Sequence, residues 1–130
     1  MIKKSNLAIV ITSIGNHIYL DQCLRSIFRQ TEKPAQIILV LPKNKDYNNI
    51  YHKLEILYSR VRNQVHQRNL GISKLSNDIK ILVQLDDSVI LEKNAIKNII
   101  KCWNLNEYQN VAGIGFNDIV PKKKSSFNGS

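Results

Sequence analysis

The sequence predicts an α/β protein, a three-layer α/β/α sandwich built around a mostly parallel sheet. Two observations lead to this prediction. Short apolar runs rich in Ile, Leu and Val alternate along the chain with segments whose apolar residues recur at helical spacing. The 130 residues are 43% hydrophobic, which is enough for one domain with its own core and too little for two. We expect this domain to cover residues 1–120, followed by a basic, disordered tail over residues 121–130.

Apolar runs predict the strands of the sheet. Three of them suit strands buried on both faces, at Leu7–Ile14, Gln36–Leu41 and Lys80–Leu85. Pro42 ends the second run, because proline cannot donate to a ladder of hydrogen bonds. A short strand and a last strand are predicted at Val61–His66 and Val111–Phe116.

Helical spacing of apolar residues predicts the helices. The helical segments are Tyr19–Gln30, Ile50–Ser59 and Asn94–Asn104. Gly71–Asn77 predicts a shorter helix or a turn. Trp103 shares the apolar face of the last helix, so we interpret it as a core residue rather than a sugar-stacking platform. Tyr47, Tyr51 and Tyr58 are expected to pack, with the alternative that Tyr47 and Tyr51 border the ligand crevice.

The charge of the chain favours anionic partners. Its formal net charge is +9, from 19 Lys and Arg against 10 Asp and Glu. Nucleotides, nucleic acid and an acidic membrane surface all fit this balance. The clusters at Lys3-Lys4 and Lys122-Lys123-Lys124 are interpreted as solvated ends of the chain.

The cysteines and the apolar runs indicate the cellular compartment in which the protein is expected. Cys23 and Cys102 lie in predicted helices without metal-type neighbours at ligand spacing, so we interpret both as free thiols. No apolar stretch has the length of a membrane span, and Leu7–Ile11 is not followed by a cleavage site of the signal-peptide kind. We expect a cytoplasmic protein, with peripheral attachment to the inner membrane face as the alternative.

Two adjacent acids follow the apolar run Ile81–Leu85, at Asp86 and Asp87. They would lie at the carboxyl end of a buried strand, where open α/β sheets bind ligands. Neighbouring carboxylates repel each other, and a hard divalent cation that carries a phosphate group would offset the repulsion. The alternative is a solvated turn or a helix-capping pair. Thr12–Asn16 and Pro42–Asp46 are expected at the same edge of the sheet.

Three motifs follow one another on the predicted elements. The first is Thr12–Asn16 with Tyr19–Ile27 and Gln30-Thr31, the second is Gln67–Ile72, and the third is Leu85–Val89. Together they resemble the nucleotide-sugar-binding half of family 2 glycosyltransferases, which has the GT-A fold. That family has a helix of the YLxxCLxSIxxQT kind, then an RNxG segment, and then a strand that ends in a DxD-type acidic motif. The resemblance covers the chain from Leu7 to Phe116.

The resemblance implies a nucleotide-sugar site. Its binding residues would be Thr12, Ser13, Ile14, Gly15, Asn16, Arg68, Asn69, Asp86 and Asp87. The turn after the first strand would pass beside the base and ribose. Arg68 and Asn69 would shape the floor of the site, unless they belong to a structural loop. Asp86 would contact the ribose or the sugar.

A metal ion is implied at the third motif. In the family, the last acid of DxD ligates the Mg²⁺ or Mn²⁺ that is bound to the diphosphate and offsets the charge of the leaving group. Ser88 stands at that position here, and a hydroxyl is a poorer ligand than a carboxylate for a hard cation. Either Asp87 takes over this role, with Asp86 and Ser88 beside it, or metal binding is weakened.

The sequence departs from the family in two further places. After the second strand the family carries acids that read the nucleoside, whereas this chain has Leu41-Pro42-Lys43-Asn44, with Asp46 only later. The acceptor site and the carboxylate that deprotonates the acceptor lie beyond Phe116 in the family, so the general base is unknown and Asp118 is not assigned that role. The chain is therefore expected to be a fragment, a truncated reading frame or one half of a split enzyme with a separate C-terminal half.

Three functions are compatible with these observations. The first is a glycosyltransferase domain that binds a nucleoside diphosphate sugar for transfer to a glycan or glycolipid acceptor in polysaccharide or glycoconjugate synthesis. The second is a catalytically incomplete nucleotide-binding remnant or partner subunit. The third, a basic nucleic-acid-binding domain, is least favoured because the sequence has no recognition helix or aromatic-interleaved basic strand.

Overall fold

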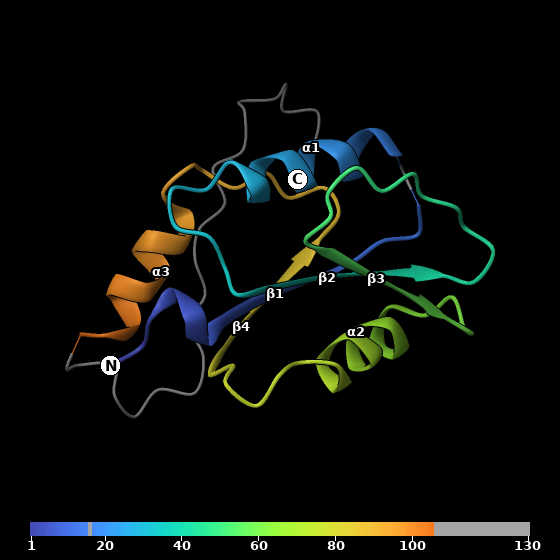
Figure 1. Cartoon of the computed structure of the whole chain (residues 1–130). Helices are drawn as coiled ribbons and strands as arrows, with labels where there is room; N and C mark the ends of the chain where they lie inside the picture. Colours follow the sequence, from blue (N-terminus) through green and yellow to red (C-terminus); the bar gives the residue numbers. More distant parts are fainter. Residues whose placement is uncertain (16, 106–130) are drawn as a thin grey trace, which may run out of the picture.

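Four parallel strands and three α-helices make up the described part of the chain. The structure is a computed structural model, in which residues 1–15 and 17–105 are described. In chain order the elements are η1 (Lys4–Asn6), β1 (Leu7–Thr12), α1 (His17–Phe28), β2 (Gln36–Pro42), β3 (Leu54–Ser59), α2 (Gln64–Ser73), β4 (Ile81–Asp86) and α3 (Ala95–Trp103). The strands form one sheet in the order β3-β2-β1-β4 (Figure 1), and all neighbours are parallel. The prediction of an α/β protein with a parallel sheet is confirmed.

The helices cover the two faces of the sheet. α1 and α3 lie on one face and α2 lies on the other (Figure 1). All six residues of β1 are buried, since this strand is central and packed on both sides. Because side chains alternate along a strand, Ile9 and Ile11 pack toward α1, while Val10 packs toward α2.

The strand β3 corrects the helix predicted at Ile50–Ser59. Leu54–Ser59 is a strand that pairs with β2, from Ile37↔Leu54 to Pro42↔Ser59. Ile50, which the helical interpretation placed on the buried face, is 74% exposed. A short apolar run fits a helix and a strand equally well by spacing alone, and here the parallel ladder with β2 decides the outcome. The backbone groups of β3 find their partners there.

The helix α2 corrects the short strand predicted at Val61–His66. The helix begins at Gln64. Asn63 caps its N-terminus, since the Asn63 side-chain oxygen accepts a hydrogen bond from the His66 backbone N–H at 3.1 Å. It ends at Ser73, so the helix or turn predicted at Gly71–Asn77 overlaps only the C-terminal end of α2 and extends past it. The buried residues of α2 are Gln67 and Gly71, neither of which is a large apolar residue. The helix was not predicted because the residues that it buries do not form an apolar pattern at helical spacing.

The remaining predicted elements within the described residues are found with small changes at their ends, but β4 is only partly buried rather than buried on both faces, because among the described strands it pairs with β1 alone. β1 ends at Thr12 rather than Ile14, and α3 covers most of the segment predicted at Asn94–Asn104. Trp103 packs against the core as predicted, and Cys23 and Cys102 are both free thiols. The predicted strand Val111–Phe116 and the predicted tail lie outside the described residues. No helix in the described part is long and apolar enough to cross a membrane.

Candidate functional site

The carboxyl ends of β1 and β4 lie side by side where the strand order reverses. The chain runs from β1 to β2 and β3 on one side, and α2 then returns it to add β4 on the other side of β1. Thr12 is the register partner of Asp86 across this junction. Ligands of open parallel sheets bind outside the carboxyl ends of the strands at such a reversal. We therefore place the candidate functional site at this junction.

Ser13 joins the turn after β1 to the acidic pair. Its Oγ donates a hydrogen bond to Asp87 Oδ2 at 2.6 Å and accepts one from the Gly15 backbone N–H at 2.9 Å. Ser13 is 4% exposed, and both contacts are partly buried. The structure thus brings the first and third sequence motifs into direct contact.

Asp86 is held by a different element. Its Oδ1 accepts a hydrogen bond from Gln64 Nε2 of α2 at 2.8 Å. Asp86 ends β4 and shares a face of the sheet with Thr12, on the side that α2 covers, whereas Asp87 is bound to Ser13. Within residues 1–15 and 17–105, neither carboxylate has a basic side chain as an ion-pair partner. Two negative charges therefore remain unneutralised at one corner of a chain whose net charge is +9.

The loop after β2 reaches the same corner. A Cβ atom built on Gly15 would lie 3.0 Å from Lys45 Cδ, so the Lys45 side chain passes directly over this glycine. Gly15 has φ +97°, which favours glycine, and Asn44 forms the turn before Lys45 with φ 75°. The segments 12–15, 42–46 and 86–88 were predicted to share this edge, and the Lys45 and Ser13 contacts connect them. Asn16 lies outside the described residues.

Arg68 and Asn69 lie within α2 rather than in a loop. Arg68 is half-buried and Asn69 is exposed. The residues through which α2 contacts the strand ends are Gln64 and Gln67, which the sequence interpretation missed. Gln67 is 2% exposed, and its Nε2 donates to the carbonyls of Ser13 at 2.9 Å and Val40 at 3.0 Å. The capping residue Asn63, followed by glutamines three residues apart, is the signal that would have found them.

The end of β1 contains an unpaired hydroxyl. Thr12 is 6% exposed, and its Oγ1 is the buried side-chain polar atom without a hydrogen-bond partner in the described part of the chain. Buried polar groups almost always have partners, and exceptions concentrate at functional positions. This hydroxyl lies on the face of the sheet that Asp86 and Gln64 share.

Cys23 of α1 lies beneath the acidic pair. Its thiol is a weak hydrogen-bond donor to the Asp86 carbonyl, with an S···O distance of 3.9 Å. Burial, followed by the negative charges of Asp87 and Asp86, raises the pKa of the Cys23 thiol to about 12. The thiol is therefore protonated at neutral pH and is not a nucleophile.

The residues at the end of β4 offer the type of donor atom that a hard divalent cation takes. Asp86, Asp87 and Ser88 offer only oxygen donors, which suit Mg²⁺ and Mn²⁺. In the described residues no group of three or more His, Cys, Asp or Glu forms a complete protein cage. Mg²⁺ is commonly bound by one or two carboxylates together with substrate phosphates and water, and two carboxylates meet that need.

Comparisons with known proteins assign no family. No protein-family model matches the chain, and no curated protein matches it significantly. The residues at the strand ends are therefore the basis for proposing a function.

Proposed function

We propose that this chain is a nucleotide-sugar-binding domain of the GT-A type, and that it takes part in transferring a sugar to an acceptor hydroxyl in polysaccharide or glycoconjugate synthesis. The observation that carries the proposal is the contact of Ser13 with Asp87 at the reversal of the strand order. This contact joins two of the three motifs that resemble family 2 glycosyltransferases. The second motif, Gln67–Ile72, lies on α2 and supports the corner through Gln67, which donates a hydrogen bond to the Ser13 carbonyl.

The protein groups at this corner have distinct roles in the proposal. Ser13 orients the Asp87 carboxylate, and Gln64 orients Asp86, so both acids are fixed before a ligand arrives. Such preorganisation lowers the entropic cost of binding. Thr12 Oγ1, which is buried and has no hydrogen-bond partner among the described residues, is a further hydroxyl for a polar ligand group.

Asp87, with Asp86 and Ser88, would hold Mg²⁺ or Mn²⁺. When bound, the cation supplies positive charge that stabilises the departing nucleoside diphosphate. Lys43 and Lys45 are exposed on the loop after β2 and add positive charge at the same edge. Clustered cations attract anionic ligands and raise their association rate. Ser88 in place of a third acid predicts that the cation binds weakly unless the diphosphate is present.

A thermal-shift titration tests the site. The full chain is titrated with UDP, GDP, CMP and their sugars, with and without Mn²⁺. A ligand that binds only the folded state raises Tm, and we expect one nucleotide to do so in a Mn²⁺-dependent manner. Asp87→Asn keeps an oxygen acceptor for Ser13 but removes the charge, so it should abolish this shift.

Asp78→Asn is the matched control. Asp78 is an exposed acid between α2 and β4, and its contacts are made through the backbone, so the variant should keep the full shift. Equal nucleotide shifts in Asp87→Asn and in the unaltered chain would rule out Asp87 as the cation ligand. No shift with any nucleotide would reject the proposed function.

A second candidate is a nucleotide-binding subunit without transfer activity. Ser88, exposed at the position of the family's metal-binding acid, favours this candidate. The two candidates differ in turnover. Release or transfer of sugar by the chain that disappears in Asp87→Asn would exclude the inactive subunit, whereas binding without turnover would favour it.

A further inference from the structure

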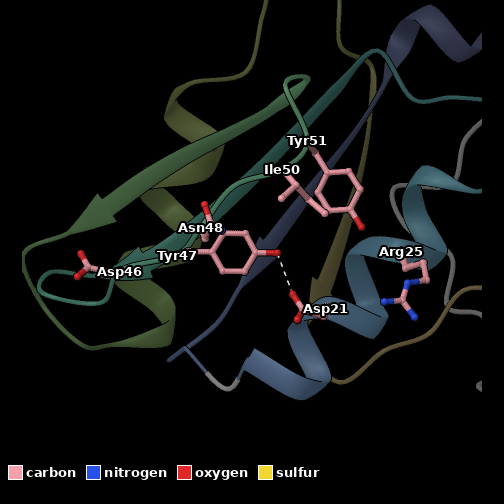
Figure 2. Close-up of a pocket in the computed structure, with 7 residues that line it drawn as sticks. All are labelled: Asp21, Arg25, Asp46, Tyr47, Asn48, Ile50 and Tyr51. Atoms are coloured by element: carbon pink, nitrogen blue, oxygen red, sulfur yellow. Dashed lines mark hydrogen bonds between the residues drawn. The ribbon is translucent and has the colours of Figure 1, made fainter.

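A separate cavity lies between α1 and the loop that joins β2 to β3. Its volume is about 590 Å³, within the roughly 300–1,000 Å³ of small-molecule pockets. Asp21 and Arg25 line it from α1, and residues of the segment 46–51 line it from the loop (Figure 2). Ser13, Asp86 and Asp87 do not line it, and of the segment 42–46 only Asp46 does, so we treat it as a second site.

The two aromatic residues of this cavity are fixed against α1. The Tyr51 ring stacks on Phe28, with ring centroids 4.2 Å apart and planes 6° from parallel. The Tyr47 hydroxyl donates a hydrogen bond to Asp21 Oδ1 at 3.0 Å, as Figure 2 shows. Burial and this hydrogen bond raise the pKa of the Tyr47 hydroxyl, so it stays protonated.

The loop itself is ordered by Asn49. The side-chain oxygen of Asn49 accepts from the Tyr51 backbone N–H at 2.8 Å, and its Nδ2 donates to the Leu54 carbonyl at 3.2 Å. The Leu54 backbone N–H in turn donates to the Tyr51 carbonyl at 3.0 Å. This connection has no helix to stabilise it, so these contacts and the two tyrosines hold it in place. These contacts give the segment that lines the cavity a defined conformation.

The polar ends that face the cavity remain available for a ligand. The side chains of Arg25, Asp46 and Asn48 are exposed and have no hydrogen-bond partner among the described residues. A guanidinium, a carboxylate and an amide are planar groups, and together they both donate and accept hydrogen bonds. In Figure 2, Arg25 extends from α1 on the opposite side of the view from Asp46.

We propose that this cavity binds an uncharged oligosaccharide. A sugar ring presents apolar C–H faces, which pack on tyrosine rings, and a rim of hydroxyls, which pair with planar polar groups. Asp21 and Asp46 outnumber Arg25 as charges, which disfavours a phosphate or another anion. The exposed polar ends disfavour a wholly apolar ligand, since binding would bury them without partners.

This proposal does not depend on nucleotide binding at the β1–β4 corner. If the proposed function also holds, the oligosaccharide would be an acceptor or a product that is held on α1 beside the transfer site. The two proposals then fail separately, because Ser13, Asp86 and Asp87, which would bind the cation and nucleotide, do not line the cavity.

The test is an NMR titration of the isotopically labelled full chain with neutral oligosaccharides of glucose, galactose, mannose and N-acetylglucosamine. Binding should shift the amide signals of residues 21, 25 and 46–51 and leave those of Ser13 and Asp87 in place. Arg25→Ala should raise Kd by about tenfold or more, because it removes charge-assisted hydrogen bonds. Asn48→Ala should weaken binding without changing the fold, since Asn48 is exposed and has no partner to lose.

Arg29→Ala is the matched control, because Arg29 is also exposed and lies about one helical turn further along the chain, outside the cavity. It should leave Kd within about twofold of the unaltered chain. The proposal is overturned if none of these sugars shifts the signals of residues 46–51, or if the shifts persist unchanged in both Arg25→Ala and Asn48→Ala. A Mn²⁺ and nucleotide titration of the same samples reads the other site independently.

Discussion

The two faces of the sheet are packed by opposite means. α1 covers its face with large apolar side chains, among them Leu20, Leu24 and Ile27, all fully buried. α2 covers the other face with the buried Gln67 and Gly71 and the partly buried Leu70, and its Gly71 lies directly against Val10. The first arrangement builds a core, while the second fixes the backbone at the strand ends. The polar helix, which contributes less apolar burial, is the one that orients the candidate site.

Gly71→Ala should lower the stability of the protein most, because it disrupts the close packing of α2 against the sheet. A Cβ atom on Gly71 would lie 2.6 Å from Val10 Cγ1 and 3.1 Å from Val40 Cγ2, both in the buried part of the sheet. Valine is stiff at χ1 and Val10 belongs to the central strand, so we expect a loss of about 2–3 kcal/mol in the free energy of unfolding. Denaturant unfolding measures the loss.

The double variant Gly71→Ala with Val10→Ala provides the control. If the clash with Val10 is the cause, the second substitution costs less in the Gly71→Ala background than in the unaltered chain. Simple additivity of the two losses would show that Gly71 is required for another reason.

Gln67→Met should have a smaller effect on stability and a visible effect on the site. Methionine fills a similar volume but leaves the carbonyls of Ser13 and Val40 without their side-chain donor. We expect a loss of about 1–2 kcal/mol and weaker nucleotide binding, because Ser13 then holds Asp87 less firmly. Chemical unfolding and the thermal-shift titration read the two effects.

Gln64→Met is the comparison for this prediction. Gln64 is exposed, so the variant should change stability by less than about 0.5 kcal/mol while it releases Asp86. Equal losses of stability in both variants would contradict the distinction between the buried and exposed glutamines of α2.

The effect that is smallest at neutral pH, because it develops only under alkaline conditions, is a pH dependence on the α1 face. The pKa of Cys23 is raised from 9.0 to about 12, so the folded state keeps its proton where the unfolded state loses it. The stabilising contribution is complete below pH 9.0 and falls as the pH rises toward 12, by up to about 1.4 kcal/mol per pH unit. Unfolding of Cys23→Ala, compared with the unaltered chain across this range, isolates the effect.

Cys102→Ala serves as the reference for the thiol, since Cys102 is only half-buried. Its stability should follow pH in the same way as the unaltered chain does. If Cys23→Ala also keeps the full alkaline fall, then Cys23 is not its source.

The sequence was sufficient where large apolar side chains do the packing. β1, β2, β4, α1 and α3 were predicted because Ile, Leu and Val recur there with the period of the element. It was insufficient for α2, whose buried face is made by Gln67 and Gly71, and for β3, whose short apolar run has no distinctive period. In both cases the structure depends on contacts with distant parts of the chain. β3 is fixed by its hydrogen-bonded ladder with β2, and α2 by the close contact of Gly71 with Val10.

The candidate site was likewise predictable only in part. Parallel strand order placed Ser13 and Asp87 at one edge, and the structure adds the hydrogen bond between them. Gln64 and Gln67 were missed because the helix that carries them, α2, was not predicted. The cavity at Arg25 and Tyr51 depends on where a loop without regular structure lies on α1, which spacing along a sequence does not encode.

Paramagnetic broadening by Mn²⁺ is the most direct test of a cation and nucleotide site at the β1–β4 corner. Mn²⁺ is added to the labelled full chain together with the nucleoside diphosphate that gives the largest thermal shift. The account predicts that the amide signals of Ser13, Asp86 and Asp87 broaden first, and that Asp87→Asn removes the effect while Asp78→Asn keeps it. Broadening centred elsewhere, or broadening that is unchanged in Asp87→Asn, would contradict it.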